Sequence, residues 1–135
     1  MTTTAPEKDE LAPLKVVVQL PAHPYAIGMA RNLVRGMHPL IDTDQLERAE
    51  LIVSEIVTNA IRHGTRKGAD VLVEFIVEPS LLRGKVTDSG PSFAPPTAKP
   101  QLGQVGGFGL HIVDHLASSW QIERTNTGNV VKFSV

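Results

Sequence analysis

The sequence contains no cysteine, and only 4% of its 135 residues are aromatic. The absence of cysteine excludes disulfide bonds, thiolate metal sites and cysteine catalysis, and it fits a reducing compartment. Few aromatic side chains are available for the base stacking by which many proteins bind single-stranded nucleic acids. A basic excess is also missing, because 14 acidic residues face 13 lysines and arginines and give a formal net charge of −1. We therefore expect no direct binding to nucleic acid or to a membrane surface.

Long hydrophobic runs are absent as well. Apolar stretches such as Val16–Val18 and Leu51–Val53 are far shorter than the ~20 residues that a membrane-spanning helix needs. Residues 1–13 lack the basic start and the apolar segment of a signal peptide, and their polar, proline-containing composition predicts a flexible tail. The length suits one domain, which we place at residues 14–135. These features predict a soluble, cytoplasmic, single-domain protein.

Strand-like and helix-like patterns alternate along this domain. β-Branched and apolar residues predict strands over 15–20, 71–77, 81–87, 120–125 and 129–135. Apolar residues at spacings of three and four predict helices over 25–37, 47–63 and 109–119. The order of these elements predicts an α+β fold, a two-layer sandwich with the helices on one face of a mixed, mostly antiparallel sheet. Glycines and prolines predict a long loop over 89–107, and loops of that length are usually functional.

The polar face of the helix predicted over 47–63 carries Glu55 and Asn59. Apolar residues recur at helical spacing on its other face: Leu46, Ala49, Val53, Ile56, Val57 and Ala60. The segment Asp42-Thr43-Asp44 offers N-cap residues, and Gly64 suits a C-terminal cap. Because Glu55 and Asn59 are four residues apart, a carboxylate and an amide oxygen could together orient a nucleophile and hold Mg²⁺. Taken alone, such a pattern is more often a solvated helix face.

Two glycine-containing segments follow later in the chain. Asp88-Ser89-Gly90 ends a strand, where a carboxylate could accept a hydrogen bond from an exocyclic amine and glycine would let a flat ligand approach the backbone. Gly106-Gly107-Phe108-Gly109-Leu110 opens a helix, whose first N–H groups could bind phosphate. Each segment alone is also typical of structure without function, the first of a turn and the second of a flexible hinge.

Taken together and in this order, the three segments resemble the GHKL (Bergerat-fold) ATP-binding superfamily. Glu55-Ile56-Val57-Thr58-Asn59-Ala60 with His63 is similar to its N-box, and Asp88-Ser89-Gly90 is similar to the start of its Asp-x-Gly-x-Gly box. Gly107-Phe108-Gly109-Leu110 is similar to its Gly-x-Gly-Leu box. In its small size, the chain resembles stand-alone anti-sigma-factor serine kinases of the actinobacterial type. The same kinases have sequences similar to SEIVTNAIRHG, DSGPSF and GGFGLHIVDHLASSW.

The resemblance implies ATP and Mg²⁺ as ligands and assigns a role to each motif residue. Asn59 would hold Mg²⁺ against the ATP phosphates, and Glu55 would be the catalytic residue that activates a serine hydroxyl of a protein substrate. Asp88 would accept a hydrogen bond from the adenine amino group, and Gly90 would let the base lie against the backbone. The nucleotide-binding residues of the last box would be Gly107, Gly109 and Leu110, with residues 91–106 as the ATP lid.

The implied activity is that of a protein serine kinase that regulates transcription as an anti-sigma factor. Its partners would be a sigma factor and a STAS-domain anti-sigma antagonist, and the resemblance also implies a homodimer. Two departures from the family pattern keep a second function open. Ser92 replaces a glycine of the Asp-x-Gly-x-Gly box, and Val130 stands where a threonine often lies near adenine. The alternative is a non-catalytic switch of the same fold that binds partner proteins with or without nucleotide.

Overall fold

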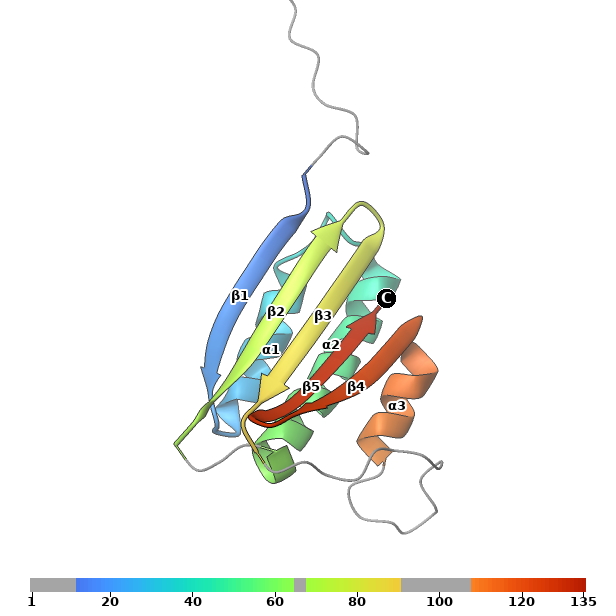
Figure 1. Ribbon diagram of the computed structural model, residues 1–135. Coiled ribbons are helices and arrows are strands. Elements are labelled where there is room, and N and C mark those ends of the chain that lie inside the picture. The colour runs from blue at the N-terminus through green and yellow to red at the C-terminus, as the bar shows by residue number, and fades with distance from the viewer. Residues whose placement is uncertain (1–11, 65–67, 91–107) are drawn as a thin grey trace, which may run out of the picture.

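The fold is a five-stranded sheet covered by helices on one face (Figure 1). The computed structural model describes residues 12–64, 68–90 and 108–135. Its elements are β1 (Leu14–Pro21), α1 (Tyr25–Arg35), α2 (Thr43–Asn59), the π-helical turn η2 (Ala60–Gly64), β2 (Asp70–Glu78), β3 (Leu81–Asp88), α3 (Phe108–Leu116), β4 (Ser119–Thr125) and β5 (Gly128–Ser134). The predicted α+β fold with helices on one face is therefore confirmed. Residues 1–11 of the predicted tail and residues 91–107 of the predicted loop lie outside the described part.

The strand order in the sheet is β1-β2-β3-β5-β4, and each of these neighbouring pairs is antiparallel. The sheet expected to be mixed is thus antiparallel throughout the described residues. Alternate residues of β2 point into the layer between sheet and helices, as period-two patterning requires. The buried ones are Val71, Val73, Phe75 and Val77.

Helix α2 supplies the centre of the core. All six apolar positions predicted for its inner face are at most 7% exposed, so that face was identified correctly. Asp42 caps its start, because a carboxylate oxygen of Asp42 accepts a 2.8 Å hydrogen bond from the Gln45 N–H. Asp44 lies inside the first turn instead and forms an ion pair with Arg48 at 3.0 Å. The predicted end at His63 divides into α-helix up to Asn59 and a π-helical turn beyond it.

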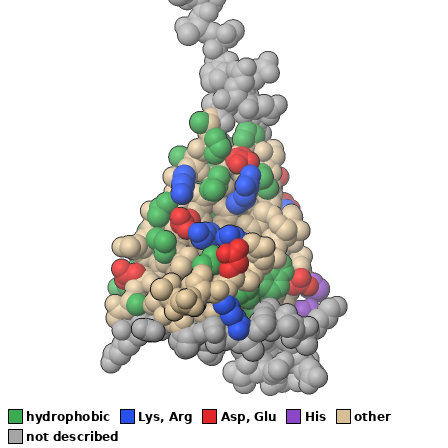
Figure 2. Space-filling view, in the orientation of Figure 1, with side chains coloured by type: hydrophobic (Ala, Val, Ile, Leu, Met, Phe, Trp, Pro, Cys, Tyr) green, Lys and Arg blue, Asp and Glu red, His purple; other side chains and the backbone are tan. Residues whose placement is uncertain are grey.

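The other face of the sheet carries no helix of the described chain. Figure 2 views this face and shows basic, acidic and hydrophobic side chains intermixed on it. Several of the charges are paired across strands, for example Lys15 and Lys85 with Glu74, and Lys132 with Glu123. The charged open face of the sheet therefore differs from the apolar face that the helices cover.

Candidate functional site

Three of the sequence motifs meet at one end of the molecule. Figure 1 shows the C-terminal ends of α2 and β3 beside the start of α3. A small cavity lies there, lined by Ile56, Asn59, Ala60, Val86, Asp88, Leu110 and Val131. The structure therefore brings together Asn59, Asp88 and Leu110, which are far apart in the sequence. With a volume of about 10 Å³, the cavity has room for about one water molecule and forms at most the inner end of a larger site.

Asp88 is the buried acid of this cavity, with 6% of its surface exposed. One carboxylate oxygen, Oδ1, accepts hydrogen bonds from the Gly90 N–H at 3.0 Å, the Asn129 N–H at 3.3 Å and the Asn129 Nδ2 at 3.1 Å. The other oxygen, Oδ2, receives none of these three bonds. Burial raises the pKa of Asp88 above its usual value, and the three hydrogen bonds lower it by less. The surroundings of Asp88 therefore disfavour its ionised form on balance.

Asn129 is the polar neighbour that the sequence reasoning missed. In the β3–β5 pairing Asp88 lies opposite Asn129, and Thr87 lies opposite Val130. Neighbouring residues of a strand point to opposite faces, so Val130 does not share the side of Asn129. Asn129 therefore lies beside Asp88. It is one residue before Val130, the position that the sequence analysis matched to the family threonine.

Gly128 allows the hairpin to approach the end of β3. A Cβ atom at Gly128 would overlap the carbonyl oxygen of Asp88 and lie 2.9 Å from the Cα of Ser89. No other residue type can occupy this position without moving one of the two strands. The close approach places Asn129, the next residue, where its backbone and side chain both reach Asp88.

Glu55 and Asn59 are both partly buried on α2. Asn59 lines the cavity, but Glu55 does not. The hydroxyls of Ser54 and Thr58 donate to backbone carbonyls one turn earlier, at 2.7 Å and 2.6 Å, so their protons are engaged within the helix. The π-helical turn begins directly after Asn59, and such wide turns occur frequently at functional sites.

The remaining predicted site residues are only partly placed. Gly90 is buried and donates to Asp88, and Gly109 lies in the first turn of α3. Gly107 and the expected lid over 91–106, including Ser92, lie outside the described residues. Within the described ranges, no group of three or more His, Asp or Glu side chains could hold a metal ion.

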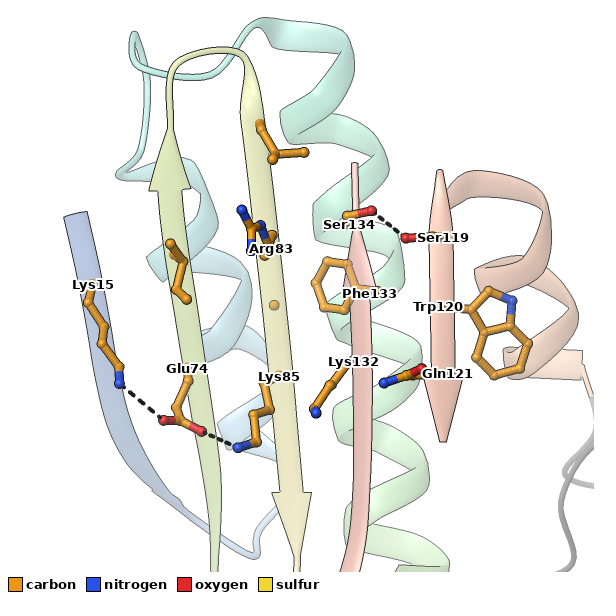
Figure 3. A pocket seen from close by; sticks show the side chains of 13 residues that line it. Lys15, Glu74, Arg83, Lys85, Ser119, Trp120, Gln121, Lys132, Phe133 and Ser134 are labelled. Carbon is orange, nitrogen blue, oxygen red and sulfur yellow. Dashed lines mark hydrogen bonds and ion pairs between the residues drawn. The ribbon is translucent and has the colours of Figure 1, made fainter. Parts of the chain in front are cut away.

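A larger hollow of about 610 Å³ lies on the open face of the sheet (Figure 3). It is bordered by charged side chains that include Lys15, Glu74, Arg83, Lys85 and Lys132. Glu74 pairs with Lys15 at 3.9 Å and with Lys85 at 3.6 Å. Among the residues that the structure describes, no predicted site residue borders this hollow. Among the described helices, none is long and apolar enough to span a bilayer.

Known proteins are similar to this chain over most of its length. The family model described as "Histidine kinase-like ATPase domain" matches residues 20–135. The serine-protein kinase RsbW of Listeria monocytogenes serovar 1/2a is 26% identical over 117 residues, which cover 76% of this chain and 74% of the relative. The serine-protein kinase RsbW of Bacillus subtilis is 27% identical over 123 residues, with 80% and 77% covered.

A solved structure supports the fold independently. The crystal structure of the RsbU and RsbW domains of a Mycobacterium tuberculosis protein superposes with a TM-score of 0.68 at 20% identity. The match covers 92% of this chain but 31% of the mycobacterial chain. At that identity the likeness concerns the fold alone.

Proposed function

Because this chain belongs to the histidine kinase-like ATPase domain family, we propose that it binds Mg²⁺-ATP and transfers the γ-phosphate to a serine of a protein partner. The observation that carries this proposal is the convergence of Asn59, Asp88 and Leu110 on one cavity. Relatives over about three quarters of the chain are named serine-protein kinases, which supports the same reaction.

The chemistry of the residues at this inner end of the site supports an adenine nucleotide as the ligand. A buried carboxylate, Asp88, suits the exocyclic amine of adenine, and the apolar Ile56, Val86 and Val131 suit the faces of a flat ring. The amide oxygen of Asn59 is a hard ligand of the kind that Mg²⁺ prefers. Each part of the ligand would thus contact residues of suitable chemistry: the amine Asp88, the ring the apolar side chains, and the metal-bound phosphates Asn59.

We assign to Glu55 the role of general base. It lies one turn before Asn59, about 6 Å along the helix axis, so an acceptor serine at Glu55 would lie beside phosphates held near Asn59. In the transfer, the serine oxygen bonds to the γ-phosphorus, the bond to the bridging oxygen breaks, and ADP leaves. Glu55 accepts the proton of the serine hydroxyl. Positioning and charge neutralisation supply most of the rate in reactions of this class.

The protein partners proposed are a sigma factor and a STAS-domain anti-sigma antagonist, with the antagonist as phosphate acceptor. In that role the chain would act as an anti-sigma factor in the cytoplasm, and the family resemblance extends the proposal to a homodimer. The second candidate function is a switch that binds its partner with or without nucleotide and without turnover. The observation behind it is that the described residues lining the cavity include no lysine or arginine to neutralise a transferring phosphate.

The test is incorporation of labelled γ-phosphate into STAS-domain proteins that bind the chain. We expect transfer by the wild type and a loss of ~10²–10⁴-fold in rate for Glu55→Gln, with ATP affinity retained. Glu123→Gln is the matched control, because Glu123 is an exposed carboxylate on β4 that pairs with Lys132. ATP binding without transfer to any bound partner would favour a nucleotide-binding switch. Absence of ATP binding would overturn the kinase and favour a nucleotide-independent switch, and absence of partner binding as well would overturn both functions.

A further inference from the structure

The solvent-facing side of α2 carries an exposed leucine next to the proposed base. Leu51 is 51% exposed and lies one turn before Glu55. Glu47, also exposed, lies one turn before Leu51. Residues four apart stack on one side of a regular helix, so the three side chains form a stripe. We call Glu47, Leu51 and Glu55 the α2 stripe.

The α2 stripe is negatively charged and has no cation of its own helix available to it. Arg48 is the one basic residue of α2, and its guanidinium is held by Asp44 at 3.0 Å and by the carbonyl oxygen of Leu116 at 3.1 Å. Two α1 arginines, Arg31 and Arg35, pair with Glu50, which is outside the stripe, at 3.7 Å and 2.6 Å. A leucine flanked by two carboxylates therefore faces solvent.

We infer that the α2 stripe docks the stretch of the substrate protein that flanks the acceptor serine. This inference rests on the proposed function, since it takes Glu55 as the base. A serine hydroxyl must come within about 2.6–3.2 Å of the carboxylate that accepts its proton, so neighbouring substrate residues must pass over adjacent turns of α2. The turn after Glu55 holds Asn59 and the cavity assigned to Mg²⁺-ATP. The turns before Glu55, with Leu51 and Glu47, remain for the substrate protein.

The spacing of the stripe defines what the substrate presents. At 1.5 Å per residue, Leu51 lies about 6 Å and Glu47 about 12 Å from Glu55 along the axis. An extended chain advances about 3.3 Å per residue, so these distances correspond to about two and about four residues from the serine. The preferred acceptor therefore carries an apolar side chain about two residues from its serine and a lysine or arginine about four residues from it.

The other exposed leucine described nearby in the sequence provides a matched control. Leu40 is 46% exposed but lies in the connection between α1 and α2, away from the stripe. Truncation of either leucine removes a similar apolar surface. Only truncation of Leu51 would remove a contact with substrate.

The experiment measures steady-state transfer to the STAS-domain acceptor with Leu51→Ala, Leu40→Ala and Glu47→Lys. We expect Leu51→Ala to raise KM for the acceptor roughly 3- to 10-fold, as loss of a half-exposed leucine contact would, with KM for ATP unchanged. Leu40→Ala should match the wild type. Glu47→Lys should also raise KM for the acceptor, and an acceptor whose basic residue is changed to glutamate should reverse that effect.

The outcomes separate the two proposals. No transfer by the wild type overturns the proposed function and the docking inference together. Transfer by the wild type with an unchanged acceptor KM for Leu51→Ala, or with equal losses for Leu51→Ala and Leu40→Ala, overturns the docking inference alone. A raised acceptor KM confined to the stripe variants supports it.

Discussion

Replacing Asp88 by asparagine should weaken ATP binding while removing a pH-dependent cost in stability. The side chain keeps its size, but the buried carboxylate becomes a neutral amide. Hydrogen bonds to charged groups contribute about 1.5–3 kcal/mol and neutral ones about 0.5–1.5 kcal/mol. The difference of ~1–2 kcal/mol corresponds to a ~5- to 30-fold rise in the Kd for Mg²⁺-ATP. Calorimetric titration with Mg²⁺-ATP measures this change directly.

Asp88→Asn should raise the free energy of unfolding of the free protein, although it weakens ATP binding. Burial raises the pKa of Asp88 above its usual 3.8, so the folded state binds this proton more tightly than the unfolded state. The free energy of unfolding therefore falls as pH rises from 3.8 through the folded-state pKa, because ionisation then favours unfolding. Asp88→Asn removes that contribution. Urea unfolding at a series of pH values should give a shallower decline for the variant than for the wild type.

Two controls make this reasoning refutable. Asp114→Asn alters an exposed aspartate on α3 that accepts a 3.0 Å hydrogen bond from the Trp120 indole, and it should leave nucleotide affinity unchanged. GTP has no amino group at the position of the adenine amine, so the wild type should prefer ATP. Equal affinity of the wild type for ATP and GTP, or an unchanged Kd for Asp88→Asn, would refute the adenine role of Asp88.

Two further substitutions test the metal ligand and the hairpin that supports Asp88. Asn59→Ala should weaken Mg²⁺-ATP binding at least several-fold, because it removes an oxygen ligand of the cation. The thermal unfolding midpoint should change little, because Asn59 is not a core residue. Unchanged affinity in calorimetry would remove Asn59 from the site. Gly128→Ala should destabilise the fold by about 1–3 kcal/mol in urea unfolding, because its Cβ would overlap the Asp88 carbonyl oxygen. Gly28→Ala is the control, because a Cβ at that helical position meets no atom within 4 Å and should be neutral or stabilising.

The architecture could be predicted from the sequence because each element carries a strong local pattern. The strand over 71–77 and the apolar face of α2 were both identified, the first from its β-branched and apolar composition and the second from its period of about 3.6 residues. The ends of the elements were less predictable. Three polar residues in succession compete to cap α2, and only the packed structure selects Asp42 over Asp44. The π-helical turn after Asn59 has no signal in the hydrophobic pattern, which continues through Ala60.

The candidate site was predictable as motifs but not as geometry. Asn59, Asp88 and Leu110 were each singled out from local sequence, and their common cavity arises from strand order and helix packing. Asn129 was not predicted as a site residue, because its position beside Asp88 depends on strand register. A shift of one residue exchanges Asn129 for Val130 opposite Asp88, and register is fixed by pairing with β3 rather than by the composition of β5.

The arrangement around Asp88 is better explained by function than by stability. A hydrophobic residue at the end of β3 would remove the cost of burying a carboxylate, and an ordinary residue at position 128 would remove the need for a glycine. The chain instead combines the buried acid with Asn129, which donates from both its backbone and its side chain to one oxygen. The three hydrogen bonds to Oδ1 fix the orientation of the carboxylate, and Oδ2 takes part in none of the three. The proposed role of Asp88 accounts for this cost, because an oriented carboxylate is what recognition of an exocyclic amine requires.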